Sequence, residues 1–184
     1  MLKKLTLKNG LRVLFFPMAN TQAVTVLFLT QTGSKFESSS INGISHLLEH
    51  LLFRGTRKFP GSSIISRRLD EIGGFYNAST SKEVLKVIVK AGSENLALAS
   101  QIVADMVKNP LLRAKDIQQE KKIVLEEIHM MEDDPRATVF DLWEKLLYGD
   151  QPAGRPIAGS AETVQKISRA DLRHHHRDFF VPRA

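Results

Sequence analysis

The first part of the chain has the hydrophobic pattern of short β-strands. Residues 5–7 and 11–16 flank Asn9-Gly10, a dipeptide typical of a tight hairpin turn. The run AVTVLFLTQT at residues 23–32 is rich in β-branched residues, which favour extended strands. We therefore predict a hairpin followed by a longer strand.

A second pair of strands is predicted at residues 75–81 and 83–91. In the latter, Leu85, Val87 and Val89 would share one face while Lys86 and Lys90 lie on the other, as in a half-buried strand. Helical spacing covers most of the remaining chain and predicts helices at residues 42–54, 62–72, 94–108, 114–131, 138–147, 161–167 and 170–180. Because strands come first and helices later, we expect an α+β domain with helices packed on one face of a mostly antiparallel sheet.

The composition is that of a single globular domain. The chain has 184 residues, of which 42% are hydrophobic and 25% charged, so it can bury one sizeable core. It has no cysteine, which excludes disulfides and thiolate metal sites. The net charge of +6 is scattered among acids without an arginine-rich block, and we expect no nucleic-acid partner.

The N-terminus has the basic start of a signal peptide but not its apolar run. Lys8 and Arg12 interrupt that run. No stretch of the chain reaches the ~18 uninterrupted apolar residues that a membrane helix needs. We expect a cytoplasmic protein without a targeting segment or a membrane partner.

The segment His46-Leu47-Leu48-Glu49-His50 has the spacing of a metal site. On a helix, positions i, i+3 and i+4 lie on one face, so the two imidazoles and the carboxylate project together. We expect Asn42 to cap this helix and Gly55 to end it. Leucines flank the motif, so its polar groups need partners, and a metal bound by His46 and His50 would supply one. Glu49 could then take a proton from a metal-bound water.

The third ligand is expected in the helix EKKIVLEEIHMMEDD, which offers Glu120, Glu126 and Glu127. Glu120 and Glu127 continue the stripe of apolar residues predicted to be buried, which consists of Ile123, Val124, Ile128 and Met131. Glu126 lies about 100° away, where an exposed ion pair with Lys122 would explain it. We interpret Glu127 as the third ligand and Glu120 as a partner that orients a ligating histidine.

The sequence resembles the pitrilysin, insulinase and mitochondrial processing peptidase family of zinc peptidases. That family has H-x-x-E-H followed after 76 residues by a ligating glutamate, and here the gap is 127 − 50 − 1 = 76 residues. The resemblance extends over nearly the whole chain, through the segments TLKNGLRVLF, GGFYNASTSKE, IVLEEIHMMEDDP, GRPIAGSAETV and FFVPRA.

The resemblance implies a role for each matching residue. His46, His50 and Glu127 would bind Zn²⁺, Glu49 would be the general base, and Glu120 matches an important acid seven residues before the last ligand. Asn77 and Ala78 match the edge strand on which family members bind a peptide substrate as an added β-strand.

The resemblance also implies that a second domain is missing from residues 1–184. Family members have a homologous second domain, and residues 1–184 would correspond to the N-terminal domain without its last strand. Either the chain is a piece of a longer protein, or it takes the missing parts from a partner chain, which includes a homo-oligomer.

Two functions remain open at this point. The first is a zinc-dependent endopeptidase acting on unfolded or extended peptides. The alternative is a catalytically silent zinc-binding or interaction subunit that acts only with a partner chain.

A second histidine cluster, His174-His175-His176, is predicted to be solvent-exposed, because consecutive helical residues diverge by about 100° and cannot converge on one ion.

Overall fold

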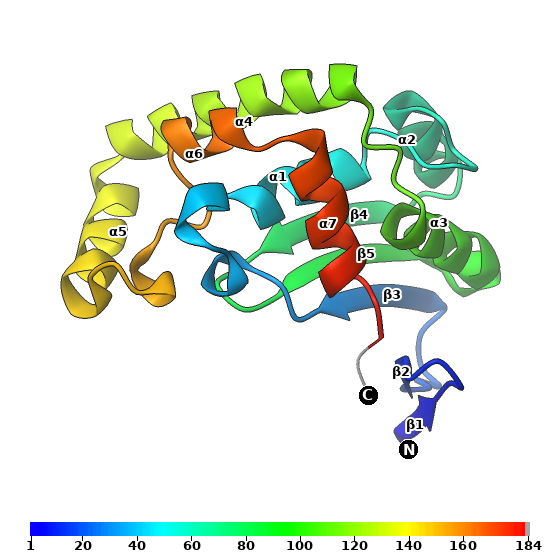
Figure 1. Ribbon diagram of the computed structural model, residues 1–184. Coiled ribbons are helices and arrows are strands. Elements are labelled where there is room, and N and C mark those ends of the chain that lie inside the picture. Colours follow the sequence, from blue (N-terminus) through cyan, green and yellow to red (C-terminus); the bar gives the residue numbers. More distant parts are fainter. Residues whose placement is uncertain (183–184) are drawn as a thin grey trace.

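A three-stranded antiparallel sheet supports the fold (Figure 1). Its strands are β3 (Ala23–Thr30), β4 (Phe75–Thr80) and β5 (Leu85–Gly92), in the order β3-β5-β4. The register pairs Val26 of β3 and Tyr76 of β4 with Val89 of β5. The three strands predicted from the sequence are confirmed, although β3 ends at Thr30 rather than at residue 32.

The helices lie on one face of this sheet, so the predicted α+β architecture is confirmed (Figure 1). The alternation in β5 is the reason: Leu85, Val87 and Val89 are buried beneath the helices, whereas Lys86 and Lys90 point to the opposite face. The structure describes residues 1–182, and its α-helices are α1 (Ile44–Leu52), α2 (Ser62–Asp70), α3 (Leu96–Lys108), α4 (Ala114–Asp133), α5 (Pro135–Tyr148), α6 (Ala161–Lys166) and α7 (Arg169–Phe179).

Helix α1 lies between two hydrophobic clusters. The first cluster joins the sheet to α2 and α3 and includes Leu52 from the end of α1. The second joins α1 to α4, α6 and α7, and α1 gives it Ile44, Leu47, Leu48 and Leu51. The helix that carries the predicted metal motif is therefore packed on two sides.

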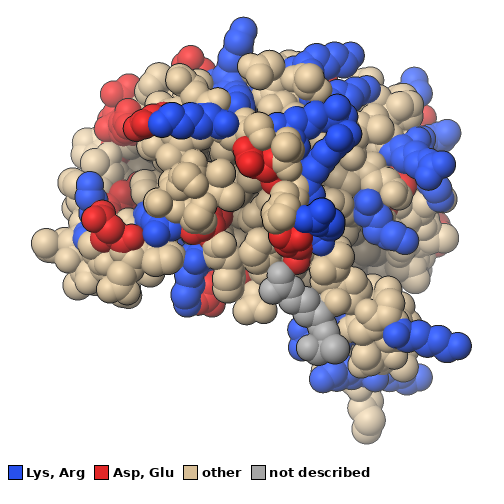
Figure 2. All heavy atoms as spheres, in the orientation of Figure 1, with Lys and Arg blue, Asp and Glu red and all other residues tan. Residues whose placement is uncertain are grey.

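The N-terminal hairpin stands apart from the sheet in Figure 1. Strands β1 (Lys3–Thr6) and β2 (Arg12–Phe15) pair with each other, and Gly10 has the positive φ of 85° that the predicted tight turn requires. The hairpin is basic, since the first twenty residues contain no acid, and its blue side chains are seen at the lower right of Figure 2.

In the described part of the chain, short 3₁₀ turns connect these elements at Ser34–Phe36, Ser39–Ile41, Ser93–Asn95 and Pro152–Gly154. Within residues 1–182, no helix combines the length and the apolar character required to span a membrane. Arg183 and Ala184, the end of the FFVPRA segment, lie outside the described residues.

Candidate metal centre

The start of α1 differs from the prediction. Gly43, not Asn42, is the capping residue, and its φ of 95° is favourable only for glycine. A Cβ at this position would lie 2.4 Å from the carbonyl oxygen of Ala158, so the chains also pass too closely for a side chain. Asn42 instead donates its amide N–H groups to the Glu37 carboxylate and to the carbonyl oxygen of Pro156.

The buried carboxylate of Glu37 takes over the capping role. Its Oε2 accepts the backbone N–H of Gly43 at 2.7 Å, and its Oε1 accepts the backbone N–H of Ser45 at 2.8 Å. A negative charge at a helix N-terminus also interacts favourably with the helix dipole. Glu37 therefore fixes the end of α1 immediately before His46.

The two histidines of the motif face the same side of α1. The leucines of the helix occupy the opposite side within the hydrophobic clusters, which turns His46, Glu49 and His50 toward α4 and β4. The imidazole centroids of His46 and His50 are 4.8 Å apart. Both rings are half-buried, so they are held in place but can be reached by a small ligand.

Helix α4 brings Glu127 to both histidines. Glu127 Oε2 lies 3.7 Å from His46 Nε2 and 3.4 Å from His50 Nε2. One ligand atom from each of these three residues falls within a group spanning 4.8 Å, and this is the possible metal-binding group found among residues 1–182. The Glu127 side chain is 39% exposed, which leaves one side of the group open.

The predicted stripe on α4 is correct in its centre and wrong at its end. Glu120, Val124 and Ile128 are buried, as the spacing predicts. Met131, however, is 41% exposed, because α4 extends beyond the body of the domain before the chain turns into α5 (Figure 1).

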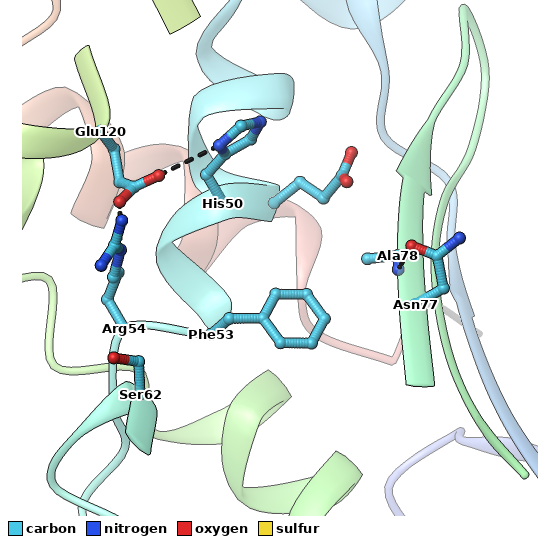
Figure 3. A pocket seen from close by; sticks show the side chains of 8 residues that line it. His50, Phe53, Arg54, Ser62, Asn77, Ala78 and Glu120 are labelled. Carbon is cyan, nitrogen blue, oxygen red and sulfur yellow. Dashed lines mark hydrogen bonds and ion pairs between the residues drawn. The ribbon is translucent and has the colours of Figure 1, made fainter. Parts of the chain in front are cut away.

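Glu120 links His50 to an arginine that the sequence analysis did not single out. Glu120 is 2% exposed, and its Oε2 accepts a hydrogen bond from His50 Nδ1 at 3.0 Å. Its Oε1 forms an ion pair with Arg54 Nε, and Figure 3 shows both contacts. Arg54 follows His50 by four residues, so helical spacing carried the signal that could have identified it.

Burial and neighbouring charges set opposite pKa shifts on the two histidines. Burial, aided by the nearby His50, lowers the pKa of His46 to about 4, so His46 is neutral at pH 7. Burial would also lower the pKa of His50, but the hydrogen bond to Glu120 and the carboxylates of Glu127 and Glu49 raise it. A metal would favour the neutral form of both rings.

Glu49 points to the sheet rather than to Glu127. Its Oε2 accepts a hydrogen bond from the hydroxyl of Thr80, at the end of β4, at 2.6 Å. Burial raises the pKa of Glu49, although the Thr80 hydrogen bond and the proximity of His50 oppose the shift. Thr80 is a site residue that the sequence analysis did not include.

Asn77 and Ala78 lie on β4, which is at an edge of the three-stranded sheet. Asn77 is exposed, and its side-chain oxygen accepts the backbone N–H of Ala78 at 2.9 Å. Between β4 and α1 lies a cavity of about 310 Å³ (Figure 3). It is lined by Glu49, His50, Phe53, Arg54, Ser62, Asn77, Ala78 and Glu120. The structure thus places the predicted substrate residues beside the predicted metal site.

The donor set fits zinc. Two imidazole nitrogens and one carboxylate oxygen converge from fixed side chains, and an open side remains for a fourth ligand. The contact from Glu120 to His50 Nδ1 leaves Nε2 of that ring free for a metal. His46 Nδ1 is buried without a hydrogen-bond partner among residues 1–182, so no carboxylate supports the second nitrogen of this ring as Glu120 does for His50.

The prediction that His174-His175-His176 is exposed is wrong for two of the three residues. His175 is 4% exposed, and its Nε2 lies 3.0 Å from the hydroxyls of Thr32 and Ser45. His176 Nε2 donates to the carbonyl oxygen of Val107. The three imidazoles diverge as the helical spacing predicts. However, α7 packs against α1 and β3, so the side of the helix that carries His175 is buried.

The fold and the candidate metal ligands together indicate a class of protein. An α+β domain in which one helix supplies two histidines and a second helix supplies a carboxylate has the metal centre of a zinc-peptidase-like domain. The family model confirms this class: the chain belongs to the insulinase family, peptidase family M16, which matches residues 12–161.

Similar proteins support this assignment. The chain is 36% identical over 180 residues to an uncharacterized zinc protease of Streptomyces coelicolor, covering 98% of this chain and 39% of the relative. It is 36% identical over 182 residues to an uncharacterized zinc protease of Bacillus subtilis, covering 99% of this chain and 44% of the relative. The chain thus spans about two fifths of the length of the curated relatives it matches.

Solved structures have the same fold. A protease from Helicobacter pylori has a TM-score of 0.94 at 26% identity, over 99% of this chain and 44% of that one. Pitrilysin has a TM-score of 0.87 at 22% identity, over 99% of this chain and 20% of that one. An M16 peptidase inactive domain from Pseudomonas fluorescens, at 18% identity, has a TM-score of 0.88 over 96% of this chain and 43% of that one. The last two likenesses show the fold alone.

Proposed function

We propose that this chain is the catalytic domain of a zinc-dependent endopeptidase. The observation that carries the proposal is the convergence of His46, His50 and Glu127 beside a cavity that also contains a separate carboxylate, Glu49. The names of the relatives, which are zinc proteases, support the identity of the metal. Zinc at this site would supply a Lewis acid that lowers the pKa of water and polarises a peptide carbonyl.

Glu49 is the proposed general base. Its carboxylate would take a proton from the attacking water and deliver that proton to the leaving amine. The raised pKa of Glu49 is suited to this task, because a carboxyl group that holds the proton more tightly is a better acceptor. The Thr80 hydroxyl would hold Oε2 in a fixed orientation while the other oxygen acts on water.

The proposed substrate is an unfolded or extended peptide added to the edge of β4. Strand addition uses backbone hydrogen bonds, so it accepts many sequences, and alternate side chains would point toward the cavity of about 310 Å³. Asn77 and Ala78 would lie along this strand, near the scissile bond. We further propose that a homologous second domain or a partner chain completes the site, since the chain covers only 39–44% of its relatives.

Substitution of two glutamates separates metal binding from chemistry. Glu49→Gln should retain about one zinc per chain and reduce cleavage of an unstructured peptide by at least about a hundredfold. Glu127→Gln should lose zinc and activity together. Glu126→Gln is the matched control, because Glu126 is exposed on the same helix, and it should change neither property.

The same cleavage and zinc measurements distinguish the peptidase from the alternative, a silent interaction subunit. If Glu49→Gln cleaved the peptide at the rate of the unmodified protein, Glu49 would not be the base. If the unmodified protein bound zinc but showed no chelator-sensitive cleavage even with its partner chain added, the domain would be an interaction subunit instead.

A further inference from the structure

Alternate residues of β4 direct their backbone groups to its free edge. Within residues 1–182, β4 pairs with β5 and with no other strand. At the turn that joins these two strands, Ser81 N donates to the carbonyl oxygen of Val84 at 2.9 Å. Hydrogen-bonded positions recur at every second residue of an antiparallel pair, so Ser79 and Asn77 direct their N–H and C=O groups to β5. The backbone groups of Ala78 therefore point to the open edge, where a substrate strand would be added.

The Ala78 N–H at this edge is already in use. It donates to Oδ1 of the Asn77 side chain at 2.9 Å, and Figure 3 shows both residues beside the cavity. Side chains alternate along a strand, so Asn77 leaves β4 on the exposed outer face, whereas the methyl group of Ala78 is buried on the side of the helices. The Asn77 carboxamide thus folds back to the edge. Its oxygen is an amide acceptor like a peptide carbonyl, and it takes the place of a carbonyl of an added strand.

Asn77 and a substrate strand compete for the same hydrogen. A backbone N–H has one hydrogen to donate, so a substrate carbonyl can accept it at full strength only after Asn77 Oδ1 has left. Because Asn77 is exposed, its side chain can move into water. We propose that the Asn77 carboxamide is a placeholder for a substrate carbonyl, which the peptide displaces when it pairs with β4. Asn77 thereby lowers the affinity for peptide instead of raising it. This inference rests on the proposed function, since it concerns the same peptide site.

A placeholder makes the edge of β4 selective for peptides that pair over several residues. A free edge strand recruits other strands without selection. With Asn77 in place, a peptide that reaches the Ala78 N–H alone exchanges one hydrogen bond for another and gains little. A peptide that extends along β4 also meets the edge-facing backbone groups of Tyr76 and Thr80, two residues to either side, and gains further backbone hydrogen bonds. The substrate favoured by this edge is therefore an extended segment.

The first measurement is peptide affinity on the Glu49→Gln background, which is expected to hold a substrate without cleaving it. Adding Asn77→Ala should tighten the binding of an unstructured peptide by about three- to tenfold, the contribution of one net hydrogen bond. Ser79→Ala is the matched control and should leave the affinity unchanged, because Ser79 lies on the same face two residues further and pairs its backbone with β5. With Glu49 intact, Asn77→Ala should lower KM and leave kcat unchanged.

The second measurement is hydrogen exchange at the Ala78 amide, followed by NMR in the protein without peptide. Asn77→Ala should speed this exchange, and Ser79→Ala should not. Equal exchange in the unmodified and Asn77→Ala proteins would overturn the inference, and so would peptide binding that Asn77→Ala weakens or leaves unchanged. A peptide that binds none of the proteins would refute the proposed function and the placeholder role with it. The exchange measurement needs no peptide, so it tells the two failures apart.

Discussion

Replacing Glu120 with glutamine tests how strongly the metal site depends on its supporting contacts. Glu120 uses both carboxylate oxygens: Oε2 accepts a hydrogen bond from His50 Nδ1, and Oε1 forms an ion pair with the guanidinium of Arg54. Glutamine has nearly the same shape but only one acceptor oxygen. Its amide group must therefore face one donor with another donor, and the negative charge that raises the basicity of His50 is lost.

The structure sets the expected magnitude for Glu120→Gln. Loss of a supporting partner of a ligating histidine typically costs 10- to 100-fold in metal affinity, so the zinc dissociation constant should rise by about that factor. A buried donor left without an acceptor costs about 1–3 kcal/mol, so the free energy of unfolding of the metal-free protein should fall by about this amount. The two effects are separable because the first is measured on the folded protein.

The assay is zinc competition against a chelator of known affinity, combined with urea unfolding in excess chelator. Glu126→Gln on the same helix is the control for loss of a negative charge. A Glu120→Gln protein that binds zinc within threefold of the unmodified protein would refute the idea that Glu120 supports His50. A matching fall in stability without any change in zinc affinity would give Glu120 a purely structural role.

Two further predictions concern stability. Glu37→Gln should lower the free energy of unfolding by about 2–3 kcal/mol, because a buried carboxylate that accepts two backbone N–H groups at the start of α1 loses its charge. The control in urea unfolding is Glu83→Gln at an exposed ion pair, which should leave the free energy of unfolding unchanged. Burial lowers the pKa of His175 from 6.5 to about 4, so between these values the unfolded chain binds a proton that the folded protein does not. His175 therefore contributes a loss of about 2 kcal/mol of stability between pH 7 and pH 5, and His175→Gln should show a smaller loss over that interval. An unchanged pH dependence in that variant would contradict the assignment.

Local spacing is what made much of the site predictable from the sequence. His46, Glu49 and His50 lie within one turn and a half of helix, and the buried stripe on α4 selected Glu120 and Glu127 over Glu126, so the periodicity of two helices was sufficient. The same periodicity places Arg54 one turn after His50, but it could not show that Arg54 pairs with Glu120 or that Thr80 contacts Glu49. Their contacts depend on how β4 and α4 are placed around α1, which is a property of packing.

The errors at the helix termini and in α7 have a similar cause. Asn42 is of a residue type that often caps helices. Here Glu37, five residues earlier, accepts the free backbone N–H groups instead, because the turns between Glu37 and α1 place its carboxylate at the start of the helix. His175 belongs to a polar run and is nevertheless buried, because Thr32 and Ser45 supply hydroxyl partners from distant parts of the chain. Residue type alone does not reveal which distant groups will become hydrogen-bond partners.

Because the proposed zinc ligands come from two different helices, metal supply would influence folding. A zinc ion held by His46 and His50 of α1 and by Glu127 of α4 would act as a cross-link between segments separated by 76 residues. Because the unfolded chain does not hold these groups together, zinc would stabilise the folded state by about 2.7 kcal/mol at a free concentration 100 times its dissociation constant. In a zinc-poor compartment the domain would open more often between α1 and α4. The free zinc concentration would thus set the resistance of the protein to degradation as well as its activity.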